Sequence, residues 1–289
     1  MKIALLDYSH SNNIGDHIQS LAVAQHLDQE YVLVDRESLS EYAGEPVIVA
    51  MNGWFTKEPE NWPPSPSITP IFFSFHMTAK AARSFEKHKS YFERFAPIGC
   101  RDQATADTFK SWGVEAYVSG CATMTFPSRK AEPEKPKIIL VDQSRRHFPR
   151  SERGNFVNLT HKFPRYLSSS VKFGIARDLL QFYRNRGGLV VTSRIHCAMP
   201  CAAMGIPVVY TGVKEGRTDI IDVIDIPKLS TRRFPRSHIA DLPLRQPSFE
   251  RLKQQITADL HFRLKSHGVK VRNPPQGRGK ATDSAVIVR

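Results

Sequence analysis

Residues 189–210, LVVTSRIHCAMPCAAMGIPVVY, contain the pattern that decides the fold. An apolar run suited to a buried strand ends at Thr192, and a segment of small apolar residues follows it. Gly205 is placed to end that segment as a helix, and Pro207 is placed to open a second strand. The order strand, helix, strand within so short a span is typical of an α/β unit with parallel strands.

The same pattern recurs on both sides of this stretch. Residues 3–7 form an apolar run that a polar loop and a helical pattern follow. Further strands are predicted at 31–34, 46–51, 71–75, 96–99 and 115–118, and then at 137–141, 156–159, 188–191 and 207–210. Because helical segments separate many of these runs, mostly parallel sheets are expected, with ligand groups at the carboxyl ends of the strands.

The length of 289 residues suits two domains. Residues 127–136 are rich in Pro, Glu and Lys and form the best linker candidate. The pattern predicts an N-terminal domain at 1–127, a second domain at 137–230 and an amphipathic helix at 248–268. Residues 269–289 have the composition of a disordered basic tail.

Positive charge gathers near the C-terminus. The chain has a net charge of +13, and residues 231–289, with 13 basic and 4 acidic residues, contribute +9 of it. Such a region is either a solvated surface or a contact for an anionic membrane leaflet. Nucleic acid is not expected as a partner, because aromatic residues do not alternate with the basic ones and no zinc-finger, RRM or KH signature is present.

The cysteine pattern and the hydropathy predict a cytoplasmic protein, and a place at the inner face of the membrane is the alternative. The four cysteines form no C-x-x-C pair, and no apolar run is long enough for a membrane span or a signal peptide. Cys197 and Cys201 share a helical spacing that suits half a metal site, but small buried helix residues are the better interpretation. Neither a metal nor a cofactor is expected.

The start of the predicted small-residue helix favours an anion. The first N–H groups of a helix lack partners and carry the positive end of its dipole. Ser193 adds a hydroxyl donor, and Arg194 a planar fork that matches carboxylate or phosphate. His196 can bind phosphate or move a proton near neutral pH. The structural alternative makes Ser193 the N-cap, Arg194 a surface residue and His196 a satisfied polar group.

Three ordered motifs resemble the signature of the polysaccharide pyruvyltransferase family. The first is 13–16, NIGD, and the second is 99–102, GCRD, followed by Thr105 and Gly113. The third is 193–196, SRIH, which stands nine residues before Gly205 in 205–209, GIPVV. The resemblance extends over residues 2–225, and the ordered set is more specific than any one motif.

The resemblance implies an α/β fold with two Rossmann-like domains that face a cleft in a GT-B-like arrangement. It implies that the pyruvyl group of phosphoenolpyruvate moves onto two hydroxyls of a sugar, which gives a cyclic ketal and phosphate. The first domain would then be the acceptor side and the second the phosphoenolpyruvate side. The acceptor is a saccharide, and a lipid-linked saccharide is one alternative.

Residue chemistry assigns roles within that reaction. His196 is the candidate general acid, Arg194 the anion clamp, and Asp16 either a base for the acceptor hydroxyl or the N-cap of the first helix. Arg101 is expected either to line the cleft or to pair locally. The set of candidate substrate-binding residues is Ser193, Gly15, Asn13, Arg101, Arg217, His161 and Asn52. Two other functions stay open: a GT-B-type glycosyltransferase that uses a nucleotide sugar, and a non-catalytic protein that binds anionic glycans.

Overall fold

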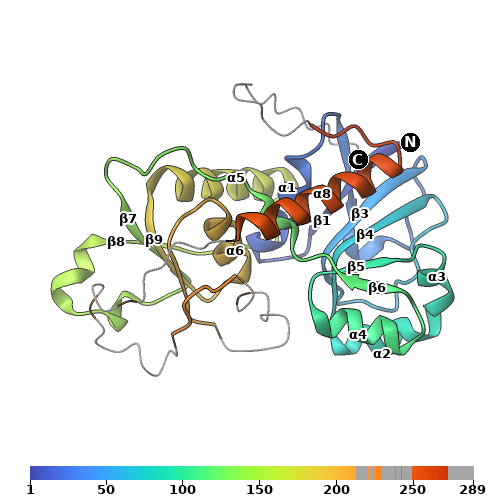
Figure 1. The fold of residues 1–289 in the computed structure, drawn as a ribbon, viewed down its shortest axis with the longest axis horizontal. Coiled ribbons are helices and arrows are strands. Elements are labelled where there is room, and N and C mark those ends of the chain that lie inside the picture. The colour runs from blue at the N-terminus through green and yellow to red at the C-terminus, as the bar shows by residue number, and fades with distance from the viewer. Residues whose placement is uncertain (213–220, 222–223, 230–237, 239–241, 243–248, 273–289) are drawn as a thin grey trace. The chain divides into compact units, whose positions relative to one another are not determined.

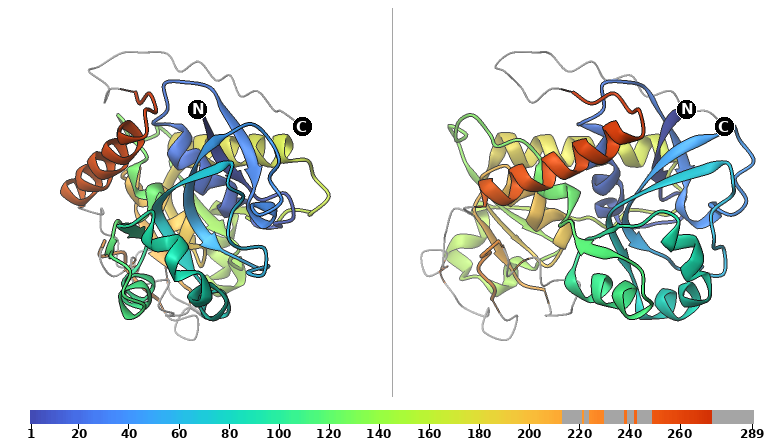
Figure 2. Two further views of the ribbon diagram at one scale, coloured as in Figure 1. Left: turned by 90° about the vertical axis from the view of Figure 1, so that its right-hand side faces the viewer. Right: turned by 45° about the vertical axis from the view of Figure 1, so that its right-hand side comes forward.

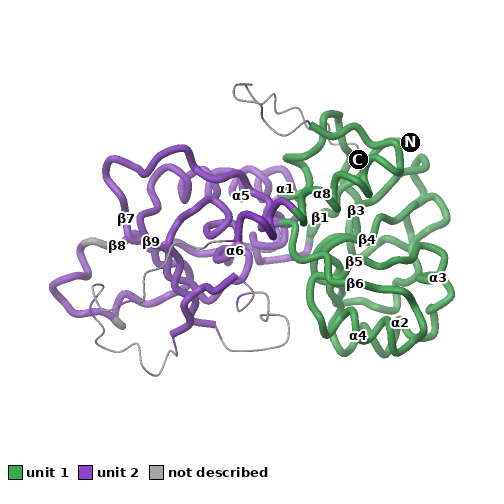
Figure 3. The backbone as a smooth tube through the Cα atoms, viewed as in Figure 1, with its two compact units in different colours: residues 1–9, 20–122, 255–289 green, residues 10–19, 123–254 purple. Residues whose placement is uncertain are grey.

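The chain divides into two compact units (Figure 3). The computed structural model describes residues 1–212, 221, 224–229, 238, 242 and 249–272. Unit 1 comprises residues 1–9, 20–122 and 255–289, and unit 2 comprises residues 10–19 and 123–254. Unit 1 therefore differs from the N-terminal domain expected at 1–127, because residues 10–19 and 123–127 belong to unit 2 and residues 255–289 belong to unit 1.

Unit 1 is built on a six-stranded parallel sheet (Figure 1). Its strands are β1 (Lys2–Asp7), β2 (Tyr31–Asp35), β3 (Val47–Phe55), β4 (Ile68–Met77), β5 (Ile98–Cys100) and β6 (Ala116–Val118). They lie in the order β2-β1-β3-β4-β5-β6, and each neighbouring pair is parallel. The α/β class and the parallel strands that the sequence predicts are confirmed.

The helices of unit 1 follow its strands along the chain. They are α2 (Ala79–Phe85), α3 (Lys89–Glu93) and α4 (Gln103–Ser111), while α1 (Ile14–Ala24) and α8 (Glu250–Ser266) begin in unit 2 and end in unit 1. Figure 2 shows α8 lying away from α2 and α4 in both views. A 3₁₀ turn at Glu86–His88 separates α2 from α3.

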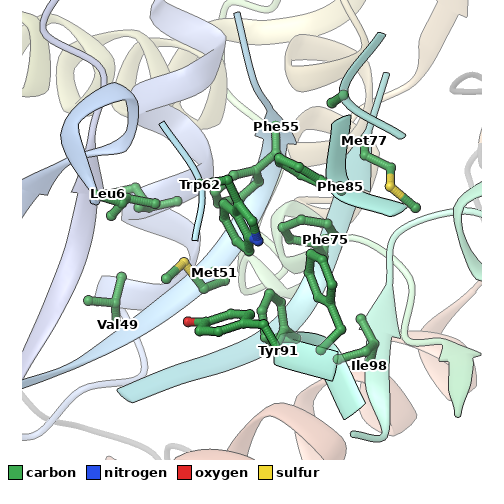
Figure 4. Close-up of a cluster of buried hydrophobic side chains, with 14 of the residues drawn as sticks. Leu6, Val49, Met51, Phe55, Trp62, Phe75, Met77, Phe85, Tyr91 and Ile98 are labelled. Carbon is green, nitrogen blue, oxygen red and sulfur yellow. The ribbon is translucent and has the colours of Figure 1, made fainter. Parts of the chain in front are cut away.

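An aromatic core fills the space between the sheet of unit 1 and α2–α4 (Figure 4). Trp62 is at its centre, stacked on Phe92 with ring centroids 5.2 Å apart and tilted against Phe85 at 4.5 Å. Offset and edge-on ring contacts of this kind add to the gain from burial itself. The core therefore fixes the helices on the sheet that carries unit 1.

Unit 2 has a second, smaller parallel sheet. Its strands are β7 (Lys137–Val141), β8 (Phe156–Leu159), β9 (Gly187–Thr192) and β10 (Val208–Tyr210), in the order β10-β9-β7-β8. Two helices, α5 (Ser169–Arg186) and α6 (Ile195–Ala203), pack with this sheet, and 3₁₀ turns occur at Ala122–Thr125, Arg145–His147 and Arg150–Asn155. The apolar run at 189–191 and the small-residue segment after it therefore form the strand and helix that the sequence predicts.

The segment expected to be a linker is held against unit 2. Arg129 Nη1 donates to the carbonyl of Gly187, and its backbone N–H donates to the carbonyl of Met204 at 3.0 Å. Lys253 Nζ also donates to Ser128 Oγ, at 3.0 Å. Residues 127–136 are therefore part of unit 2 and not a free connection between domains.

The C-terminal amphipathic helix is present as α8, and its apolar side is buried in the protein. Ile256, Leu260 and Leu264 are at most 3% exposed. The apolar face that would enter a membrane surface is therefore already used in the fold. Residues 269–272 also pack on unit 1, since Arg272 Nε donates to the carbonyl of Leu27 at 2.8 Å. The rest of the expected tail, 273–289, lies outside the described residues.

A search of the described residues for membrane-crossing segments finds no helix that is long and apolar enough.

Candidate functional site

The carboxyl ends of three strands of unit 2 meet at one edge of the sheet. Val141 in β7 is aligned with Leu159 in β8 on one side and with Thr192 in β9 on the other. In the sheet, β8 lies on one side of β7 and β9 lies on the other. The chain therefore changes direction across the sheet at β7, which makes the carboxyl end of β7 a topological switch point. Ligands of open parallel sheets bind at such points. The residues that follow these strands are thus placed for binding.

Arg194 sits at this edge as the N-cap residue of α6. Its backbone is extended, with φ −95° and ψ 118°, and its N–H donates to Thr192 Oγ1 at 3.0 Å. The structural alternative expected Ser193 to be the N-cap, but Arg194 occupies that position. The side chain is 27% exposed, and its Nε donates to Asp142 Oδ2 at 2.6 Å. Arg194 is thus an oriented cation at the edge of the sheet.

Asp142 is a member of the site that the sequence interpretation missed. Its carboxylate accepts from Thr160 Oγ1 at 2.6 Å and from the backbone N–H of His161 at 3.3 Å, in addition to Arg194. Burial raises the pKa of Asp142, but the hydrogen bonds from Thr160 and Arg194 and the charge of Arg194 outweigh it and hold this pKa below 3.8. The available signal was an acidic residue directly after a predicted strand.

His196 lies in the first turn of α6 and is 6% exposed. Its backbone is non-helical, with φ −84° and ψ 18°. The cause is four residues further on, where Pro200 has no N–H to donate to the His196 carbonyl and its ring crowds that carbonyl. Gly205, with φ +76°, ends the helix as predicted. The sequence of α6 thus builds an irregular first turn around His196.

Residues 13–16, the N-cap and first turn of α1, join this site from far along the chain. The N–H of Ile14 donates to the carbonyl of His161 at 2.9 Å, and Asn13 forms a bridge with Lys162. A Cβ atom on Gly15 would lie 3.1 Å from the Cβ atom of His196. Because that contact is tighter than side chains normally allow, Gly15 lets α1 approach His196 closely. The structure therefore brings Asn13 and Gly15 together with His196.

Asp16 lies in the first turn of α1 and is not its N-cap, because α1 begins at Ile14. Its carboxylate accepts from Ser11 Oγ at 2.6 Å and from Asn13 Nδ2 at 3.2 Å. The capping bond comes from Asn13, whose Oδ1 accepts from the N–H of Gly15 at 3.3 Å. Asp16 therefore organises the loop, and its role as a base stays a prediction.

His161 is close to the site, but its imidazole points into the core. The residue is 0% exposed, and Nε2 is 2.9 Å from the hydroxyl of Tyr183. The prediction that the His161 side chain binds substrate is therefore not supported, and its backbone instead holds Ile14 and Asp142.

The other candidates lie in unit 1 or outside the described residues. Arg101 is 2% exposed, and its Nε is 3.7 Å from Asp102 Oδ2, so the expected local pair is present but long. Asp102 caps α4 and holds His76 Nδ1 at 2.6 Å, a contact that the sequence interpretation missed. Asn52 is buried, and its carbonyl accepts from Tyr8 at 3.1 Å. Arg217 lies outside the described residues.

Within the described part of the chain, no group of three or more His, Cys, Asp or Glu side chains is placed to hold a metal ion.

The chain shares a remote likeness with three solved structures. A functionally uncharacterised protein from Klebsiella pneumoniae is 14% identical, with a TM-score of 0.49 over 82% of this chain and 92% of that one. A UDP-N-acetylglucosamine 2-epimerase is 10% identical, with a TM-score of 0.46 over 96% and 100% of the two chains. The wall teichoic acid polymerase TagF is 9% identical, with a TM-score of 0.37 over 91% and 83%. These likenesses are too remote to indicate a function.

No curated protein matches the sequence. A family model does, and it is the model for polysaccharide pyruvyl transferases, which matches residues 13–215. The matched range begins at the loop beside His196 and includes both Asp142 and Arg194. It covers more than half of the chain, and so the chain belongs to the polysaccharide pyruvyl transferase family.

Proposed function

We propose that the protein transfers the pyruvyl group of phosphoenolpyruvate onto a saccharide, and that unit 2 binds this donor. The observation that carries the proposal is the meeting of three segments, 13–16, 142 and 192–196, at the switch point of a parallel sheet in a member of this family. Phosphoenolpyruvate has a phosphate and a carboxylate on three carbons, so its site needs several hydrogen-bond donors and positive charges placed close together. Arg194, His196 and the first N–H groups of α6 supply them.

The proposed chemistry begins at carbon 3 of the donor. His196 gives a proton to this carbon, which leaves carbon 2 electrophilic. One sugar hydroxyl adds to carbon 2 and loses its proton, and the bond from carbon 2 to the phosphate oxygen then breaks. A second hydroxyl of the same sugar adds in turn and closes the ketal. One hydroxyl proton replaces the proton that His196 gave up, and the other leaves with phosphate or solvent.

Two features of the structure bear on the donor end of this scheme. Arg194 is paired with Asp142, so the site does not present an isolated positive charge. His196 is nearly buried, which allows a proton donor to act away from bulk water. That Arg101, Asn52 and Arg217 serve the same reaction stays a prediction, and so do a lipid-linked acceptor and the contact of the basic C-terminal region with an anionic membrane.

The first test is donor binding, which needs no knowledge of the acceptor. Phosphoenolpyruvate should raise the melting temperature of the wild type, whereas UDP should not. Arg194→Ala should remove most of that rise. The exposed Arg150→Ala, also in unit 2, should keep it. Stabilisation by UDP but not by phosphoenolpyruvate would favour a nucleotide-sugar glycosyltransferase instead.

The second test is turnover with a panel of p-nitrophenyl hexosides as acceptors. Phosphate release should require both phosphoenolpyruvate and an acceptor, and mass spectrometry should find the ketal product. His196→Ala should bind the donor more weakly but still measurably, and at saturating donor it should lose turnover by about a hundredfold or more, the size expected for a general acid. Full activity in that variant would show that His196 is not the acid.

A further inference from the structure

The pair formed by Asp142 and Arg194 has an arrangement that goes beyond a simple ion pair. Asp142 uses Oδ2 for the Nε of Arg194 and for the N–H of His161, while Oδ1 accepts from Thr160. Its side chain is 13% exposed. The backbone φ of Asp142 is +52°, a conformation that non-glycine residues seldom adopt. Two groups that follow the end of β8 thus hold the carboxylate in addition to Arg194.

Only one edge of the Arg194 guanidinium is used by this contact. Nε donates to Asp142, and Nη1 and Nη2 donate no hydrogen bond to any of the described residues. A guanidinium can grip a carboxylate or phosphate either through Nε and one Nη or through both Nη atoms. Because Nε is taken, the Nη1–Nη2 edge is the edge that remains for an anionic ligand.

We infer that Asp142 is a positioning residue, which fixes Arg194 through Nε so that its Nη1–Nη2 edge faces the anionic donor. This inference rests on the proposed function, since it assigns the way in which Arg194 holds phosphoenolpyruvate. Thr160 and the backbone of His161 are the supports that keep Asp142 in place. The N–H of Ile14, in the first turn of α1, donates to the carbonyl of the same His161. His161 therefore supports both Asp142 and the start of α1.

A positioning role and a simple charge effect predict opposite results. A carboxylate beside the site lowers its positive potential, so a charge effect alone means that any neutral replacement of Asp142 strengthens anion binding. A positioning role means that a replacement that still accepts from Nε keeps donor affinity, whereas one that cannot accept loses it. Asn and Gly are the suitable pair, because both tolerate a positive φ.

The experiment compares Asp142→Asn, Asp142→Gly and Thr160→Val with the wild type by titration with phosphoenolpyruvate. Asp142→Gly should raise the dissociation constant on the order of tenfold, as the loss of a group that orients a ligand commonly does. Asp142→Asn should stay within about threefold of the wild type, because its amide oxygen can still accept from Nε. Thr160→Val should show a smaller loss in the same direction as Asp142→Gly. Glu132→Gln, which removes the charge of an exposed carboxylate paired with Arg129, is the matched control and should change nothing.

A double-mutant comparison tests whether Asp142 acts through Arg194. In an Arg194→Ala background, Asp142→Gly should cause no further loss of affinity. A further loss there, wild-type affinity in Asp142→Gly, or tighter binding in both Asp142 variants would overturn the inference.

A spectroscopic readout separates this inference from the proposed function. The Nε–H resonance of Arg194, identified by its absence in Arg194→Lys, should be protected from solvent exchange in the wild type and in Asp142→Asn. It should lose that protection in Asp142→Gly. If this pattern holds while phosphoenolpyruvate does not bind the wild type, the donor assignment fails and the orientation of Arg194 by Asp142 stands. If protection is the same in all three proteins, the positioning role fails whatever the ligand.

Discussion

Pro200 changes the backbone of the site by removing a single helical hydrogen bond, the one to the carbonyl of His196. It lies inside α6, and it leaves the His196 carbonyl without the N–H that a helix would offer at that position. We expect Pro200→Ala to make the first turn of α6 regular and to move His196 away from its present place. The gained hydrogen bond offsets the small cavity left by the proline ring, so the free energy of unfolding should change by less than about 1 kcal/mol.

Turnover should respond far more strongly than stability in that variant. We expect kcat with a hexoside acceptor to fall about tenfold, because His196 would no longer be aligned with carbon 3 of phosphoenolpyruvate. Urea unfolding and steady-state kinetics measure the two effects separately. Pro164→Ala, at an exposed position of unit 2, is the control and should leave both unchanged. An unchanged kcat in Pro200→Ala would mean that the irregular turn has no role in the reaction.

Gly15 makes a second prediction at the residue scale. An added Cβ atom would lie 3.1 Å from the Cβ of His196 and 3.2 Å from Asn13 Oδ1, so Gly15→Ala should cost about 1 kcal/mol of stability and weaken donor binding. Gly174 in α5 is the matched control, since a Cβ there meets nothing within 4 Å. Gly174→Ala should raise stability by about 0.5–1 kcal/mol, as expected for a helix interior. Equal gains in the two variants, measured by urea unfolding, would contradict the tight contact.

The same residues show what the sequence could predict of the site. Arg194, His196 and Gly15 stand in local patterns, a strand end or a small-residue loop, which can be recognised without knowing the fold. Asp142 stands 52 residues before Arg194, and only the pairing of β7 with β9 brings the two together. His161 stands at a predicted strand end, but the sequence does not tell which way its ring points. Contacts between distant strand ends are therefore the part that could not be predicted.

At the scale of elements, His26 and His261 link the end of α1 to α8. His26 Nδ1 and His261 Nε2 are 3.0 Å apart. The pKa of His26 is lowered from 6.5 to about 3, first by burial and then by the charges of His261 and Arg272. The pKa of His261 is lowered as well, first by burial and then by Lys265. The neutral forms of both rings are therefore the ones that fit the fold.

This pair predicts a pH dependence of stability. The unfolded chain takes up a proton on His26 below about pH 6.5, whereas the folded protein does not until about pH 3. Stability should therefore be complete above pH 6.5 and fall as the pH drops towards 3, by up to about 1 kcal/mol per pH unit from this residue. His26→Gln should flatten the curve of unfolding free energy in that window. The exposed His267→Gln should follow the wild-type curve, and a His26→Gln curve that does the same would contradict the role of the pair.

Element boundaries show where periodicity succeeds and where it fails. The strand predicted at 137–141 has the bounds of β7, because a short apolar run with polar ends is a clear local signal. The strand predicted at 96–99 is β5 at Ile98–Cys100, since Pro97 can join a strand only at its edge or start. The charged and proline-rich segment 127–136 resembles a linker, but the donors of Arg129 tie it to unit 2. Composition alone does not record such bonds.

At the scale of the whole molecule, two of the four points at which the chain passes between the units lie inside continuous helices. Residues 14–19 of α1 belong to unit 2 and residues 20–24 to unit 1, while α8 changes units between residues 254 and 255. A sequence interpretation that looks for boundaries in loops cannot find these passages, because the helical pattern continues through them. The two α/β series were predicted correctly, but the assignment of 10–19 depends on contacts with His161 and His196.

This division predicts how the molecule responds to its donor. If phosphoenolpyruvate binds at the edge of the unit 2 sheet, backbone hydrogen exchange should slow in 192–197 and, to a similar extent, in 10–19, because the N–H of Ile14 is bonded to the carbonyl of His161 beside the same site. Residues 20–24 continue α1 but belong to unit 1, so their exchange should change less. Mass spectrometry of peptic peptides with and without the donor measures all three segments at once. Slower exchange in 192–197 with unchanged exchange in 10–19 would mean that residues 10–19 are not part of the donor site. Equal changes throughout α1 would mean that the helix responds as one body and that its first turns have no separate part in binding.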